Sequence, residues 1–213
     1  MIVPAILAYN KQAFQKYIHH LEKHTKYIQI DITDGKFVAS KTWNNVRQIK
    51  KMLPKDLKIE IHLMVKNPEK YARKWKKIPQ LETIIFHSEA VKNITKTVRK
   101  LKKYKKHIIV AINPEVHIKT LFPVLRHIDG VQFMTVFPGK QGQIFLQPVV
   151  EKIENFHEKF PEVAISADGG INEKNIPSLK KAGVTKFCIG SGILHGDVKK
   201  NYLKMEKALK NRK

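Results

Sequence analysis

The sequence predicts an α/β fold, a single-domain (β/α)8 barrel (TIM barrel) spanning residues 1–213. Three observations lead to this prediction. Short apolar runs rich in β-branched residues alternate with longer segments of helical periodicity, and about eight such strand-then-helix units follow one another. The runs are almost continuously apolar, as in parallel strands covered by helices. Eight units close into a barrel, for which 213 residues is near the lower limit.

The expected strands recur along the whole chain and are bounded by polar or glycine-containing stretches. Their ranges are Ile2–Leu7, Tyr27–Asp31, Leu57–His62, Thr83–His87, His107–Ile112, Gly130–Thr135, Val163–Asp168 and Lys186–Gly190. The expected helices lie between and after them, at Lys11–His24, Trp43–Met52, Asn67–Lys77, Asn93–Tyr104, Ile118–Leu125, Pro148–Lys159, Asn175–Ala182 and Asn201–Lys210.

Local signals agree with these elements. Asn67-Pro68 and Asn113-Pro114 are typical of the start of a turn or helix, and Gly183 lies where a helix would end. A doubly wound open sheet is the alternative fold. It is disfavoured because no Gly-x-Gly-x-x-Gly motif follows the first strand.

The chain is strongly basic, with a formal net charge of +23. Such a charge can indicate nucleic-acid or membrane binding. However, 36 of the 41 basic residues are Lys, spread along the chain without an aromatic platform of the kind that binds single strands. Arg is better suited than Lys to bidentate contacts with phosphates and base edges. A solvated Lys-rich surface is therefore the preferred interpretation, and a nucleic-acid partner is not expected.

The opening segment MIVPAILAY is too short to cross a bilayer and lacks the basic start of a signal peptide. The single Cys188 excludes an internal disulfide, which suits a reducing compartment. We therefore expect a cytoplasmic protein without a membrane partner.

Candidate functional residues lie where the expected strands end, because barrel chemistry occurs at the C-terminal ends of the strands. These residues are Asp31, His62, His87, Met134-Thr135 and Asp168. Two carboxylates and an imidazole in one pocket match a site for Zn²⁺, Fe²⁺, Mn²⁺ or Co²⁺. Individually, His62 could be a hydrogen-bonded core residue and Asp31 a turn cap.

Small residues after the last strands predict a phosphate site. Gly169 and Gly170 follow the seventh strand, and Gly190-Ser191 follow the eighth. At these places backbone N–H groups can approach an anion closely. The loop VFPGKQGQIF after the sixth strand contains Gly139, Lys140, Gln141 and Gly142, and could close over the anion.

At these residues the chain resembles the ribulose-phosphate 3-epimerase family, from PAIL near the start to GSGIL near the end. The segments that carry the resemblance, in order, are IDITDGKFV, IHLMVKNPEKY, FHSEA, INPEV, MTVFPGKQGQIF and DGGIN. The resemblance implies a barrel that interconverts D-ribulose 5-phosphate and D-xylulose 5-phosphate. In this reaction one acid removes the C3 proton and another returns a proton on the opposite face.

The resemblance also implies roles for particular residues. Asp31 and Asp168 would be the two acids, and Asp31, His62 and Asp168 would hold a divalent metal that offsets the charge of the enediolate. A fourth ligand would come from the second strand. Met64 and Met134 match methionines of the substrate pocket.

Several positions depart from the family pattern. Gln29 occupies the position of a metal-binding His, and a neutral amide oxygen is a poorer ligand for Zn²⁺, though acceptable to Mn²⁺ or Mg²⁺. Metal binding could therefore be weakened or lost. Ala5 and Ala8 replace two hydroxyl residues, the first of them a substrate contact, and Thr33 replaces a pocket methionine. Phe137 stands in place of the Asn of the flap motif.

Four functions remain open on this basis. The preferred one is an epimerase of pentulose 5-phosphates, an isomerase whose partner is a small sugar phosphate and which forms a homo-oligomer. The others are an epimerase of another ketose phosphate such as a hexulose 6-phosphate, a non-catalytic phosphosugar-binding protein, and a binder of polyanions.

Overall fold

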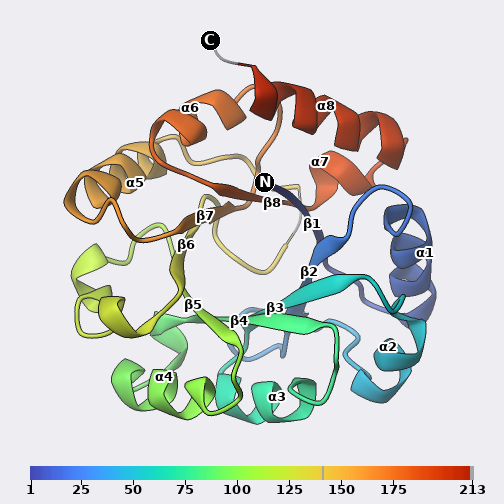
Figure 1. The fold of residues 1–213 in the computed structure, drawn as a ribbon, viewed down its shortest axis with the longest axis horizontal. Helices are drawn as coiled ribbons and strands as arrows, with labels where there is room; N and C mark the ends of the chain where they lie inside the picture. Colours follow the sequence, from blue (N-terminus) through green and yellow to red (C-terminus); the bar gives the residue numbers. More distant parts are fainter. Residues whose placement is uncertain (141, 212–213) are drawn as a thin grey trace.

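The computed structural model describes residues 1–140 and 142–211. Eight strands form a closed barrel in chain order, and every neighbouring pair is parallel (Figure 1). The strands are β1 (Ile2–Ile6), β2 (Tyr27–Thr33), β3 (Lys58–Met64), β4 (Leu81–His87), β5 (His107–Ile112), β6 (Gly130–Met134), β7 (Ile165–Asp168) and β8 (Lys186–Ile189). Because β8 pairs with β1, the predicted barrel is confirmed and the open sheet is excluded.

Helices form a ring around the strands (Figure 1). They are α1 (Lys11–Leu21), α2 (Val46–Met52), α3 (Pro68–Trp75), α4 (Ile94–Lys102), α5 (Pro148–Lys159), α6 (Ile176–Lys181), α7 (Ser191–Leu194) and α8 (Val198–Lys210), with a 3-10 turn η1 (Ser88–Ala90) after β4. Four of them begin with the same device. The side-chain oxygens of Asn10, Asn45, Asn67 and Asn93 accept backbone N–H bonds of 2.8–3.2 Å from the first turns of α1 to α4.

Two predicted helices differ in the structure, and one short helix was not predicted. Ile118–Leu125 forms two 3-10 turns, η2 (Ile118–Leu121) and η3 (Leu125–His127), because Pro123 has no N–H to continue the helical hydrogen bonds. The last helix begins at Val198, three residues earlier than predicted, where the Asp197 side chain caps it. The short α7 between β8 and α8 was not predicted.

Alternation along β2 separates the core from the site. Ile28, Ile30 and Ile32 are buried in the main apolar core, together with the inner residues of the surrounding helices. Gln29 and Asp31, which alternate with them, therefore lie on the interior side of the barrel. Adjacent parallel strands are in register there, since Asp31 pairs with His62 of β3.

A charged pair lies inside the barrel. Glu60 of β3 is fully buried, and its Oε2 accepts a 2.5 Å bond from Nζ of Lys186 on β8, whose side chain is 17% exposed. The hydroxyl of Tyr27 donates a 3.2 Å bond to the same carboxylate, and burial raises the pKa of Tyr27, which keeps this hydroxyl protonated. The pair joins strands that are distant in sequence across the interior.

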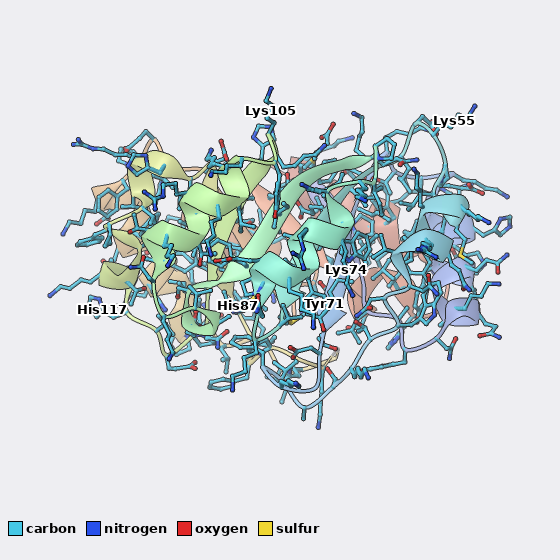
Figure 2. The ribbon with its side chains drawn as sticks, turned by 90° about the horizontal axis from the view of Figure 1, so that it is seen from below. Lys55, Tyr71, Lys74, His87, Lys105 and His117 are labelled. Atoms are coloured by element: carbon cyan, nitrogen blue, oxygen red, sulfur yellow. The ribbon has the colours of Figure 1, made fainter. Side chains whose placement is uncertain are left out.

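The outer surface is rich in Lys side chains that extend outward (Figure 2). Lys55 and Lys105 lie in loops at one end of the barrel, and His87 lies toward the other end, where the strands finish. Within the described residues, no helix is long and apolar enough to cross a membrane.

Candidate active site

Three ionisable side chains meet at the C-terminal end of the barrel. Nδ1 of His62 lies 3.3 Å from Oδ1 of Asp31 and 3.1 Å from Oδ2 of Asp168. Asp31 is 6% exposed, Asp168 is 8% exposed, and His62 is fully buried. Residues from β2, β3 and β7, far apart in sequence, therefore share one small buried volume.

Burial and mutual contact shift the pKa values of Asp31 and His62. Burial raises the pKa of the Asp31 carboxyl, and the nearby Asp168 adds to the rise, while His62 and Gln29 oppose it. For His62 burial favours the neutral ring, but hydrogen bonds and charge from Asp168 and Asp31 outweigh it and raise its pKa to about 9. The carboxylates thus favour a protonated ring between them.

A second buried imidazole, that of His87, contacts His62 on the side away from the acids. Nε2 of His62 lies 2.8 Å from Nε2 of His87, at the end of β4, so one of these two nitrogens carries a proton. Nδ1 of His87 lies 3.9 Å from Oε1 of Glu89. If Nδ1 of His62 offers a lone pair, its Nε2–H must donate to His87, and the proton of His87 then faces Glu89. Such a relay is typical of the surroundings of a metal-binding imidazole.

Two glutamine side chains contact the acids. Nε2 of Gln29 donates to Oδ1 of Asp31 at 2.9 Å and to Oδ2 of Asp168 at 2.7 Å. Nε2 of Gln132, on β6, donates to the same oxygen of Asp168 at 3.1 Å. Gln132 was not among the predicted site residues. Its signal was a single polar residue in the apolar run GVQFM, two positions before Met134 and hence on the same face.

A cavity opens directly above the two acids. Its lining includes most of the predicted site residues, namely Ala5, Asp31, Met64, Met134, Gly139, Lys140, Gly142, Asp168, Gly169, Gly170, Gly190 and Ser191. His62 and Gln29 lie beneath the acids instead of lining it. Gln141 lies outside the described residues. Gln143 was not predicted; it lines the cavity and donates a 3.0 Å bond to the carbonyl of Lys140, which supports the loop from within.

Two glycines let the loops approach one another under this cavity. Gly169 has φ of +115°, and a Cβ there would lie 2.3 Å from Cγ2 of Val136. Gly170 has φ of +62°, and a Cβ there would lie 2.8 Å from the backbone nitrogen of Phe145. Only glycine combines these backbone angles with such close packing. The loops after β6 and β7 therefore form one wall.

Comparison with known proteins identifies the family of the chain. A profile of the ribulose-phosphate 3 epimerase family matches residues 1–194. The chain belongs to the ribulose-phosphate 3-epimerase family. Among relatives of that name, the chain is 29% identical to one from Eremothecium gossypii, over 91% of this chain and 85% of the relative. It is 28% identical to one from Bacillus subtilis (90% and 91%) and 31% identical to one from Aquifex aeolicus (78% and 76%).

Two solved structures of similar shape carry other names. A 3-hexulose-6-phosphate synthase superimposes with a TM-score of 0.73 at 16% identity, covering 98% of this chain and 99% of the other. The structure of KGPDC from Streptococcus mutans gives a TM-score of 0.75 at 12% identity, covering 98% of this chain and 96% of the other. These likenesses support the fold.

The residues of this family member fit a divalent ion at three positions. Asp31, His62 and Asp168 each offer a donor atom, and the three atoms lie within 4.8 Å of one another. Carboxylate and imidazole donors suit first-row divalent metals. The expected fourth ligand, Gln29, is different, because its amide nitrogen and not its oxygen faces the acids. Its oxygen Oε1 is buried and has no hydrogen-bond partner among the described residues.

Proposed function

We propose that this chain interconverts D-ribulose 5-phosphate and D-xylulose 5-phosphate by proton transfer at C3. The observation that carries this proposal is the pair of buried carboxyls, Asp31 and Asp168, at the floor of one cavity. They come from β2 and β7, and their facing oxygens both bond to one amide nitrogen. A protein that only bound a sugar phosphate would have no need to bury two acids together, since burial of charge is costly.

Inversion at C3 requires two proton-transfer groups. A single base would return the proton to the face from which it came. In the proposed reaction one of Asp31 and Asp168 removes the proton and the other supplies one on the opposite face, and the roles exchange in the reverse direction. The raised pKa of Asp31 supports its role, because a carboxyl acting as a general acid must hold a proton closer to neutral pH.

The other end of the cavity suits the phosphate. Gly169 and Gly170 follow β7, and Gly190 and Ser191 lead into the short α7 after β8. A phosphate-binding arrangement at this place, with a short extra helix, recurs among barrels of this type. Lys140 lines the same cavity and adds a positive charge. Binding the phosphate there would place the sugar carbons toward the acids.

We further propose that Asp31, His62 and Asp168 hold a divalent metal. When bound, this ion would supply positive charge to stabilise the negative charge that develops on the substrate oxygens. Met64 and Met134 would pack against the sugar, where their polarizable side chains adapt to its shape. Ala5 leaves space where the family pattern has a hydroxyl.

Exchange of the C3 proton with D₂O, followed by NMR, tests the proposal. Wild-type protein with added Mn²⁺, Zn²⁺, Fe²⁺ or Co²⁺ should exchange and invert ribulose 5-phosphate. Asp31→Asn and Asp168→Asn should each abolish inversion, while each still exchanges the epimer whose proton the remaining acid removes. Asp56→Asn, which removes an exposed carboxylate paired with Lys26, is the matched control and should behave as wild type.

The outcomes separate the possible functions. Absence of exchange with every ion would refute the pentulose reaction, and exchange only of a hexulose 6-phosphate would favour the related epimerase. Phosphosugar binding without exchange of any substrate would indicate a non-catalytic protein.

The setting and partners of the protein complete the proposal. We propose a cytoplasmic homo-oligomer that does not bind nucleic acid. Cell fractionation, sedimentation velocity and a salt-dependent gel shift with random DNA test these three statements. A DNA complex that persists at about 0.2 M salt would contradict the last, since contacts to phosphates weaken steeply, by roughly 10³-fold or more, as salt rises to that level.

A further inference from the structure

Two glutamine amides contact the acids, and they are held differently. Both side chains are fully buried, and both amide nitrogens donate to Oδ2 of Asp168. A carboxylate oxygen only accepts hydrogen bonds, so each amide must present its nitrogen there. The difference lies at the carbonyl end of each side chain.

Gln132 is fixed at both ends. Its Oε1 accepts a 3.2 Å bond from Oγ of Ser166 and lies 3.8 Å from Sγ of Cys188, which is buried and whose raised pKa keeps it a thiol. Turning this amide would lose the bond to Asp168 and also the bond that its Oε1 accepts from Ser166. Its orientation is therefore set by the protein.

Gln29 is fixed only at its nitrogen end. It donates to Asp31 and Asp168, but its buried Oε1 has no hydrogen-bond partner among residues 1–140 and 142–211. An unpaired buried carbonyl is unfavourable, so no bond at that end opposes a half-turn of the amide. What opposes the turn is the pair of carboxylates, which would face an amide oxygen in place of an N–H donor.

A divalent cation removes that opposition. With the amide turned, Oε1 of Gln29 would face the same volume as the donor atoms of Asp31, Asp168 and His62. An arrangement of oxygens that repel one another becomes favourable when a cation lies among them. The orientation of Gln29 and occupation by a metal are therefore linked.

We propose that Gln29 is a turnable amide ligand that shifts the metal preference of this site from Zn²⁺ toward Mn²⁺ and Mg²⁺, while Gln132 stays fixed and holds Asp168 in position. The inference rests on the metal site of the proposed function and not on the reaction itself. Hard ions readily take amide carbonyl ligands, whereas Zn²⁺ favours imidazole and thiolate. Any bound ion must break the two hydrogen bonds that Gln29 donates. The new bond to the amide oxygen compensates this loss least for Zn²⁺.

Calorimetric titration of the metal-stripped full chain with Zn²⁺ and Mn²⁺ tests the preference. Gln29→His should raise Zn²⁺ affinity about 100-fold and Mn²⁺ affinity less than about 10-fold, because imidazole is the better zinc ligand. Gln132→Leu is the matched control on the same carboxylate. It should weaken both ions in similar proportion and keep their ratio within about 3-fold, since it alters position and not ligand type. The proposal would be overturned if Gln29→His raised the affinities for both ions equally, or left the Zn²⁺ affinity unchanged.

The turn itself is observable by NMR. With ¹⁵N-labelled protein, the side-chain NH₂ signal of Gln29, assigned with Gln29→Leu, should move on addition of diamagnetic Mg²⁺, and the signal of Gln132 should move far less. Equal shifts of both signals would contradict a selective turn. If Gln29→His does not fold, Gln29→Leu serves in its place and should lower Mn²⁺ affinity without lowering Zn²⁺ affinity. These readouts do not involve turnover, so failure of the epimerase assay leaves them valid.

Discussion

Replacing Lys186 by Met should destabilise the barrel strongly while leaving the cavity residues unchanged. The ammonium of Lys186 is the only cation that the described residues place within ion-pair distance of Glu60, whose side chain is fully buried. Met keeps much of the volume of Lys but leaves the carboxylate with the Tyr27 hydroxyl and the Cys188 thiol as donors. Removing one partner of a buried pair typically costs about 3–5 kcal/mol.

The remaining donors and the 17% exposure of Lys186 place the expected cost at the lower end, about 3 kcal/mol. For a chain of this size that corresponds to a fall in Tm of roughly 6–12 °C. Urea unfolding at pH 7 of wild type, Glu60→Gln, Lys186→Met and the double variant forms a thermodynamic cycle. The double variant should be more stable than the sum of the single losses by about 2 kcal/mol. A loss below about 1 kcal/mol in Lys186→Met, or simple additivity, would refute the reasoning.

Three further predictions concern Gly169 in the cavity wall, the Asn93 cap of α4 and the buried imidazole of His62. Gly169→Ala should cost at least about 2 kcal/mol in urea unfolding and abolish phosphosugar binding, because its Cβ would overlap Val136; a neutral result would contradict the close packing. Asn93→Ala should cost about 1 kcal/mol through loss of the α4 cap, whereas Asn93→Ser should cost much less; equal losses would argue against capping. In EDTA, the stability contributed by His62 should be complete below pH 6.5 and lost as pH rises to about 9, because folding raises its pKa; the dependence should flatten in His62→Gln, and a flat wild-type profile would contradict the shift.

Much of the fold could be predicted from local patterns. Continuous apolar runs marked the strands because they reflect burial on both faces, and Asn67-Pro68 marked the start of α3. The helix predicted after β5 is wrong because helical periodicity does not reveal that Pro123 interrupts the backbone hydrogen bonds. The short α7 has too few residues to show any periodicity.

The site could be predicted in composition but not in geometry. Asp31, His62 and Asp168 were found because parallel strands present their last residues at one end of a barrel. The orientation of Gln29 depends on the partners of its two amide atoms, which come from strands far apart in sequence. Gln132 was missed for a related reason. A polar residue in an apolar strand does not reveal its partners, which here come from β7 and β8.

The pairing of β1 with β8 has a consequence for production of the protein in pieces. This seam joins the first strand to the last, so a fragment that stops before β8 leaves both β1 and β7 with exposed, unpaired backbone groups. Such edges recruit other chains. Shortened versions should accordingly accumulate as aggregates, and supplying β8 with its following helices as a separate peptide should recover dispersed material.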